Sequence, residues 1–291
     1  MGSRVHGVSA VRFAAAAGLS AGLLLAAACG GSGASTSPAP IPPTTPTTPT
    51  PPAAPVANAC SVVSGFSGTP PGIVNGVACT DQQADRSSVV WLHLLGGDGL
   101  AVGYCSGTVI DAQAVLTAAH CLESPTKQVA AYMGSGRPAI TTRAFYASPD
   151  YTGIGPSSLD VGVVIFASSL ERTPIPLFTS RALSGGESAV VAGWGTDGVS
   201  TGSGTLRAGN LNVTRVTLTQ IEAAFSDSSS GVCYGDSGGP LLASSSGVWA
   251  VAGVTSKGTP GCMSGANSWA NVFNSNIKSF ILKHVPGAAQ R

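Results

Sequence analysis

Short apolar runs separated by turn residues make up the chain from about Cys60 to its end. The runs are rich in Val and Ile, and Gly, Ser, Asp and Asn separate them. Five of them are 88–95, 107–110, 161–166, 189–194 and 248–254. Runs of this length and composition predict the strands of a β-sandwich or β-barrel.

One stretch near the C-terminus follows a different period. Between Asn274 and His284, three apolar residues and the terminal histidine recur at the spacing of one helical face: Ile277, Phe280, Ile281 and His284. The whole pattern therefore predicts an all-β fold with a C-terminal helix. About 220 residues are available, which is enough to bury a substantial core.

The first 28 residues have the pattern of a targeting segment. Arg4 and Arg12 form a basic start, and the 16 residues 13–28 are uncharged, a run that is short for a membrane span. The run ends in LAAACG, which resembles the lipobox of bacterial lipoproteins, although Ala26 stands where that motif usually has Leu. We expect lipid attachment at Cys29; ordinary secretory cleavage is the alternative.

The next segment, from Gly30 to Asn58, has no charged residue, and its prolines cluster with threonines. Such a sequence cannot bury enough apolar surface to offset its ordering entropy, so we expect an extended spacer. At about 3.1 Å per residue it could reach about 90 Å. A proline-rich docking motif is the alternative reading.

The charge balance excludes one class of partner. The 291 residues carry 14 Lys and Arg against 13 Asp and Glu, a net charge of +1. Nucleic-acid binding needs a concentrated cationic surface, so we expect no nucleic-acid partner. No His/Cys pair has metal-ligand spacing and the acidic residues are scattered, so neither a metal nor a cofactor is expected.

Two local patterns supply candidates for acid–base chemistry. In the segment 116–121, LTAAHC, small residues let the backbone approach closely while His120 presents its ring. Asp160 stands directly before the apolar run 161–166. Burial of a carboxylate is costly unless it is paired, so Asp160 needs a partner such as an imidazole N–H. Asp150 is a rival, but no buried run follows it directly.

The third pattern is the decamer GVCYGDSGGP at 231–240. A serine flanked by glycines can lie on a tight turn with its hydroxyl exposed. The N–H groups of Gly235 and Ser237 could then point at one position, which is the geometry that an oxyanion hole requires.

With these patterns in this order, the chain from Ile73 to about Val285 resembles the trypsin/chymotrypsin-like serine proteases. The Gly-Trp-Gly at 193–195 matches another landmark of that family. The resemblance implies two antiparallel six-stranded β-barrels with the active site between them. It also implies a serine endopeptidase acting on protein or peptide substrates, and we expect a monomer.

The resemblance assigns the catalytic roles. Ser237 would attack the scissile carbonyl, His120 would take and return its proton, and Asp160 would orient the imidazole. The N–H groups of Gly235 and Ser237 would hold the oxyanion. A pseudoprotease that serves as a surface binding module is the rival hypothesis, but inactive relatives typically lose a catalytic side chain. A purely structural lipoprotein would not explain the decamer.

The sequence IVNG at 73–76 resembles the mature start of that family, whose freed amine pairs with the aspartate before the nucleophile, here Asp236. This implies a zymogen, although Gly72 replaces the usual basic residue. The expected plan is a signal peptide at 1–28, a lipidated Cys29 with a Pro/Thr-rich linker at 29–59, a propeptide at 60–72 and the protease domain at 73–291.

The resemblance also implies a substrate pocket formed by Gly231, Ser256, Gly258 and Asn267. Gly231 lies at its base, where an aspartate would select Arg or Lys. Gly258 would keep the pocket open and Asn267 would add one amide. We therefore expect medium-sized uncharged side chains to be preferred.

The cysteine count is seven, an odd number. Cys29 is assigned to lipid, which places the rest of the chain in an oxidising space outside the cytoplasm, at a bacterial membrane. The resemblance implies two disulfides and leaves two cysteines for a third; the pairs are Cys105–Cys121, Cys233–Cys262 and Cys60–Cys79. The third would span Gly72–Ile73 and keep a cleaved domain joined to its anchor.

Overall fold

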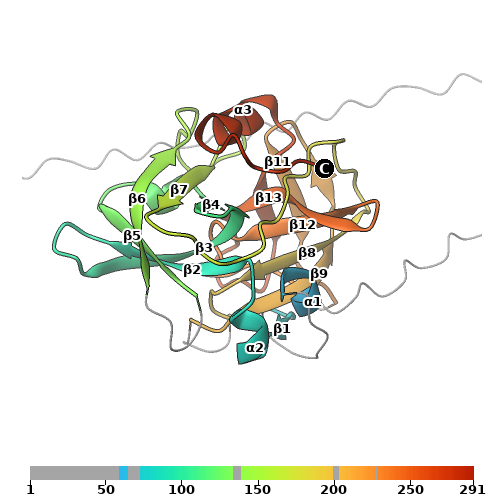
Figure 1. Ribbon diagram of the computed structural model, residues 1–291. Helices are drawn as coiled ribbons and strands as arrows, with labels where there is room; N and C mark the ends of the chain where they lie inside the picture. Colours follow the sequence, from blue (N-terminus) through green and yellow to red (C-terminus); the bar gives the residue numbers. More distant parts are fainter. Residues whose placement is uncertain (1–58, 65–72, 134–138, 199–202, 227) are drawn as a thin grey trace, which may run out of the picture. The chain divides into compact units, whose positions relative to one another are not determined.

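The computed structural model of the chain describes residues 59–64, 73–133, 139–198, 203–226 and 228–291 (Figure 1). The expected signal segment, Cys29 and nearly all of the linker lie outside the described residues, as does Gly72. No helix in the described ranges is both long and apolar enough to cross a membrane.

Six antiparallel strands close into the first barrel, in the order β2-β3-β4-β7-β6-β5. Their bounds are β2 Val89–Leu95, β3 Ala101–Asp111, β4 Ala114–Thr117, β5 Gln128–Tyr132, β6 Ile140–Ala147 and β7 Gly162–Phe166. In β2, buried positions alternate with half-buried ones after Val90, because successive side chains point to opposite faces of a strand.

The second sheet has eight antiparallel strands in the order β1-β9-β8-β12-β13-β14-β11-β10. Its strands are β1 Val77–Ala78, β8 Ser188–Gly193, β9 Arg207–Asn212, β10 Arg215–Val216, β11 Gln220–Ala224, β12 Pro240–Ser245, β13 Val248–Lys257 and β14 Ala266–Asn271. The expected second six-stranded barrel is thus an eight-stranded sheet in the described residues, with two-residue strands at both edges, and the closed barrel is the first one. The mostly β, trypsin-like fold class is thus confirmed.

The C-terminal helix is also confirmed, as α3, Ser275–His284. Asn274 caps it, because its side chain accepts hydrogen bonds from the N–H groups of Asn276 and Ile277. The apolar face that the sequence predicted is buried. The ring of His284 stacks on Tyr146 at a centroid distance of 4.0 Å, so the helix packs against the first barrel.

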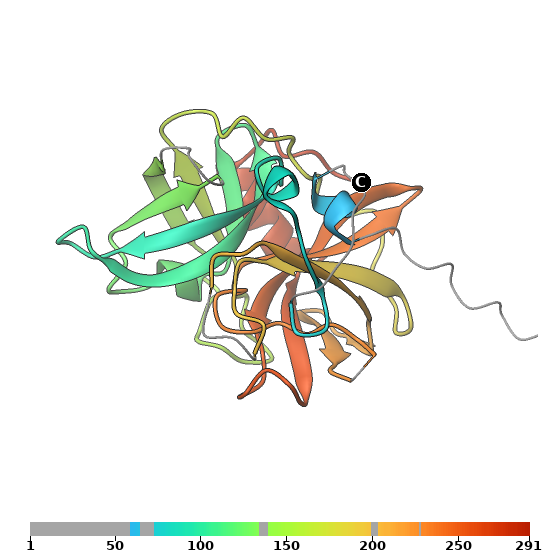
Figure 2. The same cartoon turned by 90° about the horizontal axis from the view of Figure 1, so that it is seen from below.

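Two short helices precede the first barrel: α1, Ala59–Ser64, and α2, Asp81–Ala84. The helix α1 contacts β8, β9 and α2, and Figure 2 shows the two helices near one another. Ala59, Cys60 and Val63 are each no more than 3% exposed. This part of the expected linker and propeptide therefore packs into the hydrophobic core.

All three expected disulfides form: Cys60–Cys79, Cys105–Cys121 and Cys233–Cys262. The first fastens α1 to the chain just after β1. The second joins β3 to the short 3-10 helix η1, His120–Leu122, that follows β4. Three disulfides in one domain are typical of proteins outside the reducing cytosol.

Ser106 of the first barrel connects the two sheets. Its hydroxyl donates to the carbonyl of Gly235 (2.9 Å) and accepts from the N–H of Trp194 (2.9 Å). Its own N–H donates to the carbonyl of Ser237 (2.8 Å). The serine-bearing loop is thereby attached directly to β3 of the first barrel.

Candidate active site

His120 and Asp160 form the closest ionisable pair of the site. Nδ1 of His120 lies 2.7 Å from Oδ2 of Asp160, and the backbone N–H of His120 donates to Oδ1 (3.0 Å). The histidine side chain is 18% exposed and the aspartate side chain 2%. The ring is thus held by a buried carboxylate while its other edge stays accessible.

A third group holds this carboxylate. The hydroxyl of Ser256 donates to Oδ2 of Asp160 (2.7 Å) from the end of β13. The rival Asp150 instead accepts a hydrogen bond from Asn276 on the surface (3.3 Å). The histidine therefore pairs with Asp160 and not with Asp150, as expected from the buried run that follows Asp160.

Ser237 lies in a loop whose backbone conformation requires glycine on both sides of the serine. Gly235 and Gly238 have φ values of +91° and +80°, which non-glycine residues rarely adopt. A Cβ on Gly238 would lie 2.4 Å from the carbonyl of Ser106 and 2.9 Å from the N–H of Ala118. The backbone after Ser237 therefore rests on the segment that leads to His120.

The N–H groups of Gly235 and Ser237 donate to no protein acceptor within the described part of the chain. They remain available to a ligand. Within the same residues, no hydrogen bond links the Ser237 hydroxyl to the His120 ring. In unliganded enzymes such bonds are often long and tighten only with substrate.

Asp236 is buried behind this loop and is 1% exposed. Its carboxylate accepts from the N–H of Gly195 (2.9 Å) and from the N–H of Cys233 (2.8 Å). Burial raises the pKa of Asp236 to about 7, although the two N–H groups and the charge of Arg207 act in the opposite direction. The carboxylate therefore titrates near neutral pH.

Ile73, the expected partner of Asp236, is 1% exposed. The residue after it, Val74, accepts a hydrogen bond from the N–H of Gly231 (3.0 Å). The start of the expected protease domain is therefore packed beside the pocket segment in this chain. An ion pair between a freed amine at Ile73 and Asp236 stays a prediction.

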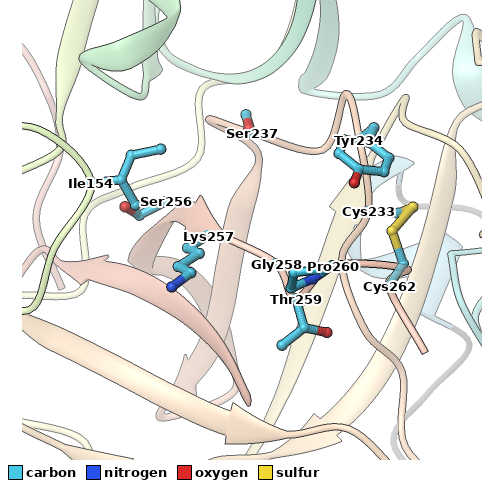
Figure 3. A pocket seen from close by; sticks show the side chains of 10 residues that line it. All are labelled: Ile154, Cys233, Tyr234, Ser237, Ser256, Lys257, Gly258, Thr259, Pro260 and Cys262. Carbon is cyan, nitrogen blue, oxygen red and sulfur yellow. A yellow bond between two sulfur atoms is a disulfide. The ribbon is translucent and has the colours of Figure 1, made fainter. Parts of the chain in front are cut away.

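A cavity of about 310 Å³ opens beside Ser237. Its lining is Ile154, Cys233, Tyr234, Ser237, Ser256, Lys257, Gly258, Thr259, Pro260 and Cys262. Figure 3 shows Tyr234 and the Cys233–Cys262 disulfide on one side and Ile154 with Ser256 on the other. Two of the expected pocket residues, Ser256 and Gly258, thus line it.

The other two expected pocket residues lie outside that lining. Gly231 is covered by Phe225, since a Cβ on Gly231 would be 2.8 Å from the phenyl Cδ2. The same Cβ would be 3.3 Å from Nδ2 of Asn267. Asn267 is fully buried, and neither polar atom of its amide has a hydrogen-bond partner in the described residues.

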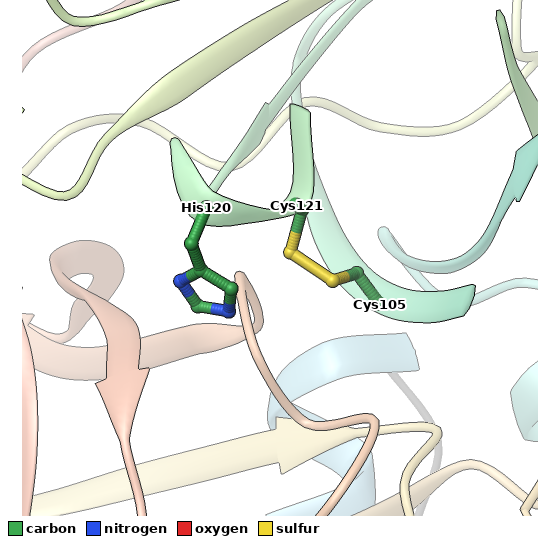
Figure 4. Close-up of side chains that lie close together, drawn as sticks. All are labelled: Cys105, His120 and Cys121. Carbon is green, nitrogen blue, oxygen red and sulfur yellow. A yellow bond between two sulfur atoms is a disulfide. The ribbon is translucent and has the colours of Figure 1, made fainter. Parts of the chain in front are cut away.

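Cys105, His120 and Cys121 offer atoms within 4.8 Å of one another, a spacing that could suggest a metal site. Figure 4 shows that the two sulfur atoms are joined, and a disulfide supplies no thiolate ligand. The bridge instead fixes the turn that carries the histidine.

Several lining residues were not predicted from the sequence. Tyr234, 71% exposed, stands inside the decamer, so its position beside Ser237 could have been inferred. Ile154 comes from a loop more than eighty residues before the serine, and no local pattern marks it. The role of Arg207 near Asp236 was also not predicted, because the sequence around it reads as an ordinary strand.

A histidine, a buried aspartate and a glycine-flanked serine thus lie between a closed β-barrel and a second antiparallel sheet, an arrangement typical of trypsin-like proteins. The family model described as Trypsin matches residues 73–281, and the chain belongs to the trypsin family.

Trypsin alpha-4 of Lucilia cuprina is 30% identical over 195 residues, which are 58% of this chain and 72% of that protein. A trypsin-like protease of Streptomyces glaucescens is 26% identical over 181 residues, 54% of this chain and 66% of that protein. The solved structure of HL collagenase has a TM-score of 0.58 and 22% identity, and the match covers 74% of this chain and 99% of that one. This last likeness concerns the fold alone.

Proposed function

We propose that the protein is a serine endopeptidase that uses His120, Asp160 and Ser237 as its catalytic triad. The observation that carries the proposal is the 2.7 Å contact between the His120 ring and the buried Asp160. The family supports peptide-bond hydrolysis as the reaction class.

In the proposed reaction, the Ser237 oxygen attacks the scissile carbonyl and Nε2 of His120 takes the hydroxyl proton. The resulting oxyanion accepts hydrogen bonds from the free N–H groups of Gly235 and Ser237. His120 then gives its proton to the leaving amine, which breaks the peptide bond and leaves an acyl-enzyme. Water hydrolyses this ester by the same proton transfers in reverse. Asp160 orients the imidazole and stabilises the imidazolium through the contact with Nδ1.

The proposed substrates present an uncharged side chain at the cleaved bond. Among the described residues that line the cavity beside Ser237, Lys257 is charged and none carries a carboxylate that could pair with Arg or Lys. The unpartnered amide of Asn267, next to Gly231, could meet a polar group of the substrate if Phe225 moves aside. A peptide-library profile dominated by Arg or Lys would overturn this preference.

Hydrolysis itself is tested with a quenched peptide library and the purified full chain. We expect cleavage by the wild type and none by Ser237→Ala, whereas Ser180→Ala, at an exposed serine outside the site, should cleave normally. A folded wild type that binds peptides without cleaving them would favour the binding-module hypothesis instead.

The domain plan belongs to the same proposal. A signal peptide at 1–28, lipid at Cys29 and a linker to 59 would tether the enzyme outside the cytoplasm, and Cys60–Cys79 would keep it tethered after cleavage at 72–73. Radioactive palmitate should label the wild type but not Cys29→Ala. Equal labelling of both would refute the lipid anchor. Sequencing the N-terminus of active protein decides whether processing precedes activity.

A further inference from the structure

Asp236 has a nearby positive charge that does not depend on cleavage of the chain. Arg207 lies on β9 directly opposite Gly193 of β8. Residues directly opposite in an antiparallel pair have their side chains on the same face of the sheet. A Cβ on Gly193 would lie 2.2 Å from Oδ1 of Asp236, so the Arg207 side chain shares the face on which this carboxylate is buried.

Arg207 is also tied to the carboxylate through one residue. Its Nη1 donates to the carbonyl of Gly195 (2.9 Å), and the N–H of Gly195 donates to Asp236 (2.9 Å). Arg207 is 9% exposed, and its Nη2 pairs with Asp197 at 3.1 Å. Its Nε is buried with no hydrogen-bond partner in the described ranges. The charge of this guanidinium lowers the pKa of Asp236, in the same direction as the two N–H groups that donate to the carboxylate.

The same arginine holds an oxyanion donor in place. The carbonyl that it binds belongs to the Gly195–Thr196 peptide, whose N–H donates to the carbonyl of Tyr234 (2.9 Å). In a planar trans peptide the C=O and N–H point in opposite directions. With the Tyr234 carbonyl fixed on Thr196, the N–H of Gly235 must point the other way, where none of the described residues offers an acceptor.

These arrangements exist in a chain that is continuous through Gly72–Ile73. Ile73 is already buried, and Val74 already pairs with Gly231. Moreover, Gly72 offers no basic residue for a trypsin-like activator. We propose that Arg207 is a positioning residue that favours the ionised form of Asp236 and, through the Gly195 carbonyl, holds the Tyr234–Gly235 peptide in its catalytic orientation, so that the uncleaved chain is already active. This rests on the proposed serine peptidase function.

The test is labelling of the purified full chain with a fluorescent fluorophosphonate, followed by a reducing gel. Reduction opens Cys60–Cys79, so a chain cleaved at 72–73 runs smaller than the intact one. We expect the label on the intact band of the wild type. If only a cleaved band is labelled, the inference is overturned and the proposed function stands. If neither band is labelled, the proposed function fails.

Three variants test the role of Arg207 itself. Arg207→Met should label about tenfold more slowly at pH 7, because it loses the hydrogen bond to the Gly195 carbonyl and also a charge that lowers the pKa of Asp236. Arg207→Lys, which keeps the charge, should recover most of that rate. Arg215→Met is the control, since this arginine is 62% exposed and pairs with Glu222 on the surface. It should label like the wild type.

The pH profile separates a charge effect from a packing effect. In the described residues, the groups that face Asp236 are Arg207 and the N–H groups of Gly195 and Cys233. The loss in Arg207→Met should therefore shrink as the pH rises, with the acidic limb of the profile moved to higher pH. An equal loss at every pH, or no rescue by lysine, would overturn the proposal and leave Arg207 a packing role.

Discussion

The two halves of the site are stabilised in different ways. The His120–Asp160 half is held by side-chain hydrogen bonds of 2.7–3.0 Å that converge on one carboxylate. The Ser237 half is held by backbone: two glycines with positive φ, carbonyls fixed on Ser106 and Thr196, and a buried carboxylate beneath. Substitution of one side chain should therefore disable the His120–Asp160 half. The geometry of the Ser237 half should instead change when residues distant in sequence are substituted.

The largest effect is expected when the first half is broken at its carboxylate. Asp160→Asn should lower kcat/KM about 10⁴-fold, because an amide favours the wrong imidazole tautomer and cannot stabilise the imidazolium. Asp150→Asn is the matched control and should change kcat/KM little, since the Asp150 carboxylate accepts a hydrogen bond from Asn276 on the surface. Steady-state peptide hydrolysis measures both. Comparable losses in the two variants would contradict the assignment of Asp160.

The second half should break most severely where its backbone meets the first barrel. Gly238→Ala would push a Cβ against the carbonyl of Ser106, and its φ of +80° is strained for alanine. We expect a loss of unfolding free energy of about 3 kcal/mol or more, together with activity. Gly247→Ala has the same φ but open space around it, so its cost should be about 1 kcal/mol. Urea unfolding distinguishes the two, and equal costs would mean that the close approach is unimportant.

A smaller effect is expected when one of the hydrogen bonds to the Asp160 carboxylate is removed. Ser256→Ala removes one of the hydrogen bonds to Asp160, which should lower kcat/KM about tenfold or slightly more. Ser180→Ala, an exposed serine outside the site, should leave kcat/KM unchanged. An unchanged value for Ser256→Ala would show that the histidine contact alone holds the carboxylate.

The smallest expected effect concerns stability and the buried carboxylate of the second half. The pKa of Asp236 is about 7 in the folded chain against an ordinary 3.8. Between these values the folded state keeps a proton that the unfolded state has lost. The free energy of unfolding should therefore fall by about 1 kcal/mol from pH 6 to pH 8. Urea unfolding at several pH values should show that Asp236→Asn lacks this decrease. The same decrease in the variant and the wild type would show that Asp236 does not cause it.

The first half could be predicted almost completely from the sequence. His120 follows a small-residue turn, and Asp160 precedes a buried strand, so local pattern reveals both. The core strands and α3 could be predicted for the same reason, since period and composition are local. The packing of α1 against β8 and β9 could not, because six residues carry too little periodic signal.

For the Ser237 half, the sequence identifies the residues but not the contacts that hold them. The decamer indicates Ser237 and its glycines, but not what fixes the loop. Arg207 and Thr196 act through backbone carbonyls at residues distant in sequence, and such contacts leave no residue-type pattern. The burial of Gly231 under Phe225 likewise depends on how the chain after β11 folds back on itself, which no local motif records.

The central claim is that Ser237 is a nucleophile activated by His120. It is tested most directly by mass spectrometry of the fluorophosphonate-treated chain after proteolytic digestion. The account predicts one adduct, on Ser237, which disappears in His120→Ala although that variant folds. A folded wild-type chain without an adduct, or an adduct on another serine, would contradict it.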